Sequence, residues 1–198
     1  GEGEGDGEGE GEGEGEGEGD PNPGQLIMRV SWPSGGGDVD ILATKRDGAG
    51  RYCIQNNFAS PTNNVGPLSE ECSGNPPFDC YYYDCAAAPP DWDEDGVVSN
   101  GDPAYGAQSE TGALPESITV FAAAEGEYLL ATVYWSPQGS TTATVEVFLD
   151  GNAIAAYSAQ VAVSNTAQWF DVAKIVKRAD GTVCIEDLLD GDLTDERG

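Results

Sequence analysis

The chain contains no histidine, and only 8 of its 198 residues are lysine or arginine, against 36 aspartates and glutamates. The missing imidazole removes the usual general base, the commonest transition-metal ligand and the side chain that titrates near neutral pH. The formal charge of -28 argues against nucleic acid or an anionic membrane surface as a partner, because both require clustered basic residues. Cations are therefore the expected counterpart of this chain.

No run of 18 apolar residues is present, so the sequence predicts no transmembrane segment. Residues 1–20 alternate glycine with glutamate or aspartate, and a Pro-Asn-Pro-Gly sequence ends the run at residue 24. Such a segment buries nothing that would offset its ordering entropy. We expect residues 1–24 to form an acidic tether of an extracellular or cell-surface protein, with a lipid anchor upstream of Gly1 as an open alternative.

The most informative stretch is 91–102, which has acids at positions 1, 3, 5 and 12 and glycine at position 6. Ca²⁺ takes six to eight oxygen ligands, so a short loop must curl and direct alternate side chains inward, and glycine permits the bend. The pattern therefore predicts a calcium loop. The expected ligands are Asp91, Asp93, Asp95, the carbonyl of Val97, Ser99 and Asp102.

Chance alone would produce this pattern roughly 0.01 times in a chain of this composition. The alternative interpretation is an acidic, solvated turn. Pro89, Pro90 and Pro103 flank the loop and argue against helices on either side, so an EF-hand is not expected. Val98, at the eighth position, is expected to anchor the loop to a core.

From residue 25 to residue 190 we expect one domain, which is long enough to bury a single core. Short runs rich in β-branched and aromatic residues, bounded by glycine, proline and serine, indicate strands. They lie at 26–32, 38–44, 117–121, 128–135, 144–149, 154–163, 169–176 and 182–185, with hairpin turns at Asp150-Gly151 and Asp180-Gly181. The predicted fold class is all-β, an antiparallel sandwich or jelly roll, with an acidic tail at 191–198.

Residues 57–115 are rich in Pro, Asn, Gly and Asp and are too long for a plain connection, so a site is expected there. The five cysteines predict a disulfide framework rather than a zinc site, whose ligand spacing and histidines are missing. The expected pairs are Cys80 with Cys85 and Cys53 with Cys72, which leaves Cys184 unpaired. Spacing alone leaves other pairings open.

Several short motifs follow one another in an order typical of a known class of domains. They include Trp32-Pro33, Gly37-Asp38-Val39-Asp40-Ile41, Asp79-Cys80-Tyr81-Tyr82, Gly101-Asp102-Pro103, Gly126-Glu127-Tyr128 and Trp169-Phe170-Asp171-Val172-Ala173. Over most of residues 26–186 the chain resembles secreted bacterial β-sandwich domains related to pre-peptidase C-terminal domains, which carry an Asp-x-Asp-x-His opening. The resemblance implies a calcium site at Asp38, Asp40 and Glu116, although Leu42 stands where the histidine would be.

Aromatic side chains also gather in the loop-rich region, at Tyr82, Trp92 and Tyr105. Such rings stack on sugars in carbohydrate-binding sandwiches, and these three are candidate ligand-binding residues. The alternative is that they cover an edge of the core.

Three classes of function remain open at this point. We expect a non-catalytic, calcium-stabilised module with an adhesive, glycan-binding or scaffolding role, whose partners are calcium and a surface glycan or protein. The second class is a structural subunit of an extracellular filament, assembled through the N-terminal segment or an edge strand. The third is a glycoside hydrolase that uses paired carboxylates such as Asp91 and Asp93, although the sequence singles out no acid with a raised pKa.

Overall fold

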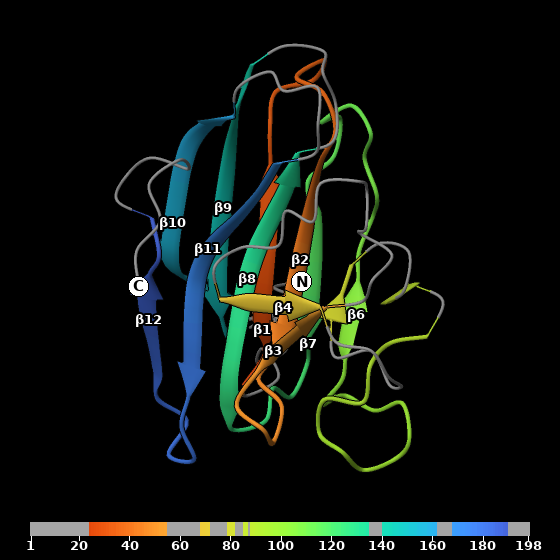
Figure 1. The fold of residues 1–198 in the computed structure, drawn as a ribbon, viewed down its shortest axis with the longest axis vertical. Helices are drawn as coiled ribbons and strands as arrows, with labels where there is room; N and C mark the ends of the chain where they lie inside the picture. The colour runs from red at the N-terminus through yellow and green to blue at the C-terminus, as the bar shows by residue number, and fades with distance from the viewer. Residues whose placement is uncertain are drawn as a thin grey trace, which may run out of the picture.

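The computed structural model describes residues 24–54, 68–71, 79–81, 85–86, 88–134, 140–161 and 168–189. Two five-stranded antiparallel sheets pack together in it, which confirms the predicted all-β class and sandwich architecture (Figure 1). The predicted tether at 1–24, apart from Gly24, and the predicted tail at 191–198 lie outside the described residues.

The first sheet has the strand order β10-β9-β1-β7-β6 and the second has the order β12-β11-β8-β2-β5. In the first sheet the bounds are β10 Asn152–Val161, β9 Thr141–Leu149, β1 Leu26–Ser31, β7 Glu116–Val120 and β6 Pro103–Tyr105. In the second they are β12 Val183–Asp187, β11 Gln168–Lys177, β8 Gly126–Tyr134, β2 Val39–Lys45 and β5 Asp79–Cys80. Two further strands, β3 Tyr52–Ile54 and β4 Ser69–Glu71, pair in parallel.

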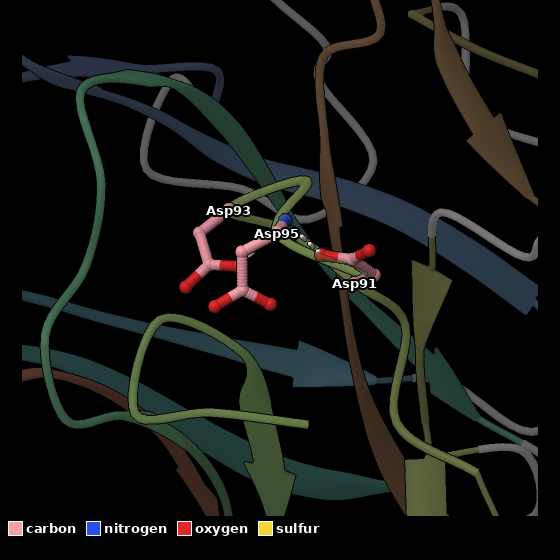
Figure 2. Close-up of side chains that lie close together, drawn as sticks. All are labelled: Asp91, Asp93 and Asp95. Carbon is pink, nitrogen blue, oxygen red and sulfur yellow. Dashed lines mark hydrogen bonds between the residues drawn. The ribbon is translucent and has the colours of Figure 1, made fainter. Parts of the chain in front are cut away.

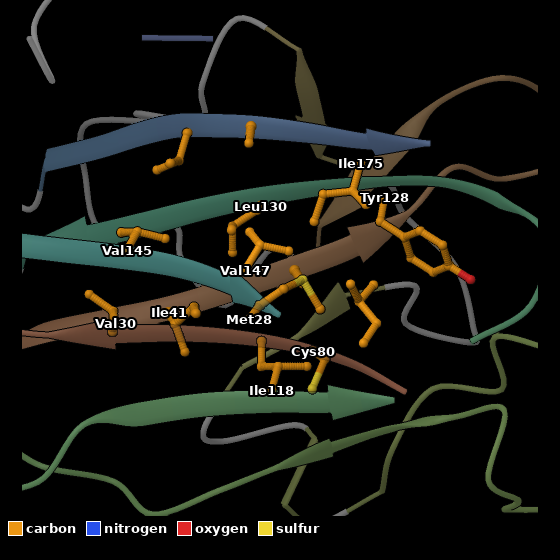
Figure 3. Packing of buried hydrophobic residues seen from close by; sticks show 14 of the residues in the cluster. Met28, Val30, Ile41, Cys80, Ile118, Tyr128, Leu130, Val145, Val147 and Ile175 are labelled. Atoms are coloured by element: carbon orange, nitrogen blue, oxygen red, sulfur yellow. The ribbon is translucent and has the colours of Figure 1, made fainter. Parts of the chain in front are cut away.

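The core lies between the two sheets and follows the alternation of side chains along each strand. In β1, Leu26, Met28 and Val30 are buried while the residues between them are half-exposed. Figure 3 shows the buried side chains of both sheets meeting in one cluster, among them Met28, Val30, Ile118, Val145 and Val147 from the first sheet and Ile41, Tyr128, Leu130 and Ile175 from the second. Burial of these apolar side chains is the main stabilising contribution to the fold.

The second sheet is covered on both faces where β2 and β8 lie. Ile41 belongs to the inter-sheet core, whereas Leu42, its neighbour in sequence, packs with Ile54 and Tyr81 in a separate buried cluster. This double coverage explains why the first six residues of β2 are all buried, whereas a strand with one solvated face would show alternation. It also gives a packing role to Ile54 in β3 and to Tyr81, which directly follows β5.

Both predicted hairpin turns are present. Asp150 and Gly151 have φ values of 50° and 77°, so both central residues of the β9–β10 turn are left-handed, as the twist of a two-residue hairpin requires. Gly181, between β11 and β12, has a φ of 83°. These turns fix the register of the two hairpins that close one side of the sandwich.

Four described strands were not predicted from sequence: β3, at Tyr52–Ile54, and three others. Residues 57–115 were expected to form one long loop, yet β4, β5 and β6 lie within them. Each of these strands has only two or three residues. So short a segment shows no hydrophobic period, and it forms only because a neighbouring strand pairs with it.

The predicted Cys80–Cys85 disulfide is confirmed, and the predicted Cys53–Cys72 disulfide is described only at Cys53. Cys80 and Cys85 are bonded, with their Cα atoms 4.7 Å apart, and Cys53 is also disulfide-bonded. Cys72, the expected partner of Cys53, lies outside the described residues. Cys184 is free and exposed, as predicted.

Trp32 and Gly112 form a close contact that generates a test of the packing. Gly112 has a φ of 73°, and a Cβ placed on it would lie 2.7 Å from both Cδ1 and the carbonyl oxygen of Trp32. Gly35 has a similar φ of 83°, but a Cβ there would meet nothing within 4 Å. We expect Gly35→Ala to lower the free energy of unfolding by about 1 kcal/mol, from backbone strain alone. Gly112→Ala should lower it by about 2–4 kcal/mol, because overpacking adds to that strain.

Urea unfolding of the two variants checks this prediction. Equal losses of stability would show that Trp32 moves aside without penalty and that the contact is not a constraint.

Candidate metal centre

The loop at 91–102 is fixed to the core by its second residue. It connects the Cys80–Cys85 region to β6 and forms the yellow-green loop at the lower right of Figure 1. Trp92 is only 1% exposed, and its ring centroid lies 5.4 Å from that of Tyr128 in β8. Lys45, at the end of β2, donates a hydrogen bond to the carbonyl oxygen of Trp92. The start of the loop is therefore held from two strands of the second sheet.

Asp102 ties the two ends of the loop together. Its Oδ1 accepts the backbone N–H of Trp92 at 2.6 Å, and its Oδ2 accepts that of Ser99 at 2.9 Å. The residue is 3% exposed. Asp102 stays a predicted calcium ligand: each of its oxygens accepts one backbone N–H of the loop, and the residue lies outside the acidic group described next.

Asp91, Asp93 and Asp95 converge on one turn, as Figure 2 shows. One carboxylate oxygen of each lies within 4.8 Å of the others. The backbone folds around them: Asp91 accepts the N–H groups of Asp95 at 3.1 Å and Gly96 at 2.9 Å, and Asp95 accepts that of Val97 at 2.9 Å. Gly96 permits this curl with a φ of 79°.

Asp93 is the most constrained of the three acids. Ser99 donates its hydroxyl to Oδ2 of Asp93 at 2.6 Å, and this bond holds the pKa of Asp93 below its ordinary value, with a further contribution from the charge of Lys45. The side chain also lies directly over Gly101, where an added Cβ would meet Oδ2 at 1.9 Å. Asp93 is thus kept ionised and aimed by its neighbours.

The arrangement suits a hard divalent cation. The three side chains offer only oxygen, which is what Ca²⁺ and Mg²⁺ prefer. A carboxylate oxygen that accepts one backbone N–H keeps a lone pair for a metal, so the hydrogen bonds that shape the turn do not prevent coordination. Three carboxylates in one exposed turn therefore provide both the charge and the ligand type that such an ion needs.

Two expectations for this loop were wrong, and one stays a prediction. Val98 was expected to anchor the loop, but it is 74% exposed, and Trp92 fills that role instead. Trp92 was a candidate for sugar stacking, yet its buried ring has no open face. The carbonyl of Val97 remains a predicted ligand, and its side chain is 63% exposed.

Sequence reasoning missed Lys45, and it named Gly101 only within the Gly101-Asp102-Pro103 motif, without a role beside Asp93. Lys45 lies 47 positions from Trp92, so only the pairing of strands brings the two together. Gly101 is a loop glycine whose close approach to Asp93 depends on the fold of the turn.

Asp38, Asp40 and Glu116, the site implied by the family resemblance, do not form a comparable group. Among the described residues, the acids that lie close enough together to share one ion are Asp91, Asp93 and Asp95. Asp38, Asp40 and Glu116 are not grouped in this way. The three acids do lie in one neighbourhood, because the charges of Glu116, Asp40 and Asp38 all add to the burial that raises the pKa of Tyr105. Burial, followed by repulsion from Glu110, also raises the pKa of Asp38.

Glu116 links the two sheets. It is fully buried at the start of β7, and it accepts hydrogen bonds from the hydroxyl of Tyr105 at 2.5 Å, the N–H of Ser109 at 2.8 Å and, more weakly, the N–H of Ile41 at 3.4 Å. Ile41 lies in the opposite sheet. The candidate sugar platform Tyr105 is therefore half-buried with its hydroxyl engaged, and Tyr82 lies outside the described residues.

Comparisons with known proteins leave the family open. No family model matches the chain, and no curated protein matches it. A solved structure described as the crystal structure of the unknown function protein SAV2460 shares 11% sequence identity, covers 84% of this chain and 88% of its own, and has a TM-score of 0.44. Within the described residues, no helix is long and apolar enough to cross a membrane.

The burial of Glu116 generates a pH prediction. Because its folded-state pKa is raised above 4.5, the folded protein keeps this proton at pH values where the unfolded chain has lost it. The free energy of unfolding should therefore fall as the pH rises through that window, starting from about pH 4.5. In Glu116→Gln, which cannot ionise, this component of the fall should disappear.

Urea unfolding of both proteins in EDTA, between about pH 4.5 and pH 7, measures the effect. Parallel pH profiles of the wild type and Glu116→Gln would contradict it.

Proposed function

We propose that this protein is a non-catalytic, calcium-stabilised β-sandwich module that works outside the cell in adhesion or scaffolding. The observation that carries the proposal is the convergence of Asp91, Asp93 and Asp95 within 4.8 Å on a turn fastened to the core. A chain with a formal charge of -28 gains from binding a cation at such a place.

Calcium is favoured over other metals by the ligand set. The chain has no histidine, and no cysteine lies in the loop, so the soft and borderline ligands that zinc and copper prefer are missing there. The loop backbone also supplies carbonyl groups beside the three carboxylates, as a site of six to eight oxygens requires. Magnesium demands a smaller, near-octahedral shell and binds through fewer protein ligands.

A structural role is favoured over hydrolysis by the electrostatics of the same turn. A glycoside hydrolase needs one carboxyl group with a raised pKa as its general acid. In Asp93 the bond from Ser99 lowers the pKa instead. An acid held ionised by its neighbours suits a cation ligand better than a proton donor.

The position of the loop suggests what the ion would do. The loop precedes β6, an edge strand of the first sheet, and is attached through Trp92 to β8 of the second sheet. A bound cation would neutralise repulsion within the turn and hold this connection between the sheets. The module would then present a stable surface to a protein or glycan partner only where calcium is plentiful, as it is outside cells.

The central prediction concerns thermal unfolding of the full chain. Calcium at about 100 times its dissociation constant should stabilise the folded state by about 2.7 kcal/mol, a rise in Tm of roughly 5–10 °C. The double variant Asp93→Asn, Asp95→Asn should lose most of this rise. The two substitutions keep the shape of the side chains but remove two of the three carboxylate charges grouped in the turn.

The matched control is Glu110→Gln combined with Glu125→Gln, which makes the same change in net charge at exposed sites outside the loop. It should keep the calcium response. A rise of equal size with Mg²⁺, or an unchanged rise in the loop variant, would contradict the proposal. Binding of calcium to residues 1–20 in both folded and unfolded chains cancels from this measurement.

A second prediction tests the placement of Asp93. Gly101→Ala puts a methyl group where Oδ2 of Asp93 lies, so the side chain must leave its position. We expect calcium affinity, measured by calorimetric titration, to fall at least about tenfold. Gly48→Ala, at an exposed glycine with nothing within 4 Å of the added Cβ, should leave the affinity unchanged. Equal affinities of the two variants would show that Asp93 is not a ligand.

A further inference from the structure

The outer edge of β10 is open. β10 ends the first sheet, and no strand among the described residues pairs with it on the side away from β9. Figure 1 shows β10 at the side of the molecule opposite β6. An open edge presents a row of unpaired backbone N–H and C=O groups, which is a template for another strand.

The other three edges of the two five-stranded sheets carry features that oppose such pairing, and the strands of the small sheet, β3 and β4, have only three residues each. β6 has three residues and begins with a proline, and β5 has only two residues. β12 has five residues, the last two of which are Glu186 and Asp187. Shortness, proline and charge are the usual means by which proteins protect edge strands. β10 has none of these over its ten residues, and its one bulge is confined to Ala153 and Ala155 at its start.

β10 is also the least charged part of a strongly acidic chain. Charged residues make up 44 of the 198 positions, from 8 basic and 36 acidic, yet residues 151–170 contain none. Two copies of a protein with a charge of -28 repel each other over most of their surfaces. At β10 they can approach without placing like charges opposite one another.

The side chains of β10 leave room for a neighbour and gain from one. Ala156, Ser158 and Gln160 are exposed and uncharged, and two of them are small. Tyr157 packs only partly against the core, and Ile154 is 40% exposed. A strand laid along this edge would cover apolar surface that the sandwich itself leaves open.

We propose that β10 pairs antiparallel with β10 of a second copy, about a twofold axis, and joins two five-stranded sheets into one. Identical strands can meet in this way because a twofold contact uses the same surface on both copies. Every cross-strand pair is then uncharged whatever the register, since β10 contains no charged residue. The strand also carries no charged side chain that a partner of opposite charge could bind.

This twofold contact limits the assembly to two copies. Pairing uses up β10 of both copies, and the remaining edges are the protected ones, so the product is a dimer rather than a filament. The area along one strand is small, so the dimer should be weak, with a dissociation constant on the order of 10–100 µM. Because the interface lacks ion pairs and the copies repel, added salt should strengthen the dimer. The inference does not depend on calcium binding.

Sedimentation velocity of the full chain in a Cys184→Ser background tests the proposal, because that change removes dimers linked through the exposed thiol. We expect a reversible monomer–dimer equilibrium that tightens as salt is raised. Ala156→Lys should weaken it at least about tenfold, because it places a lysine of each copy in the middle of the paired strands, where the two like charges repel. Ala104→Lys, at an exposed residue of β6 on the opposite edge of the same sheet, should leave it unchanged.

Thermal unfolding of both lysine variants confirms that they fold. A protein that stays monomeric up to about 500 µM overturns the proposal, since that concentration exceeds the expected constant several-fold. An unchanged dimer in Ala156→Lys, or an open-ended series of larger species, overturns it as well.

Discussion

Hydrogen bonds from backbone N–H groups to carboxylates hold the loops of this sandwich, and the candidate metal site is one product of that constraint. With 8 basic side chains for 36 acids, ion pairs can serve only a minority of the acids, and in the loops described here backbone donors take that place. Asp102 closes the loop before β6, Asp150 binds the N–H groups of Gly24 and Gln25 at the start of β1, and Glu116 links the sheets. Neutral donors orient these carboxylates but leave their charge in place.

That uncompensated charge connects the two proposals. Where three oriented carboxylates converge, at Asp91, Asp93 and Asp95, the remaining charge favours a cation. Where charge is missing altogether, along β10, two copies can meet without repulsion. The same composition thus separates the surface into a part suited to ions and a part suited to backbone pairing. Both depend on the sandwich, because it fixes the loop through Trp92 and leaves β10 at an edge.

The sequence was informative where structure is local. A short run of apolar and β-branched residues located β1, and Asp150-Gly151 located a hairpin, because both signals lie within a few residues. The spacing of three acids and a glycine likewise predicted the acidic turn. It could not predict that Asp102 would turn to the backbone or that Trp92 would be buried, because those outcomes depend on Ser99 and on Tyr128, which the fold brings close. Contacts between residues that are distant in sequence cannot be predicted from the spacing of neighbouring residues.

The most direct test of the account is luminescence of terbium, a calcium substitute, excited through tryptophan in the full chain. Trp92 adjoins Asp91 and Asp93, so an ion held there lies beside an indole, whereas residues 1–20 contain no tryptophan. The account predicts sensitised emission that calcium displaces and that is lost when Asp93 and Asp95 are both changed to asparagine. Absence of sensitised emission, or emission that persists in that variant, would contradict a metal site in this loop.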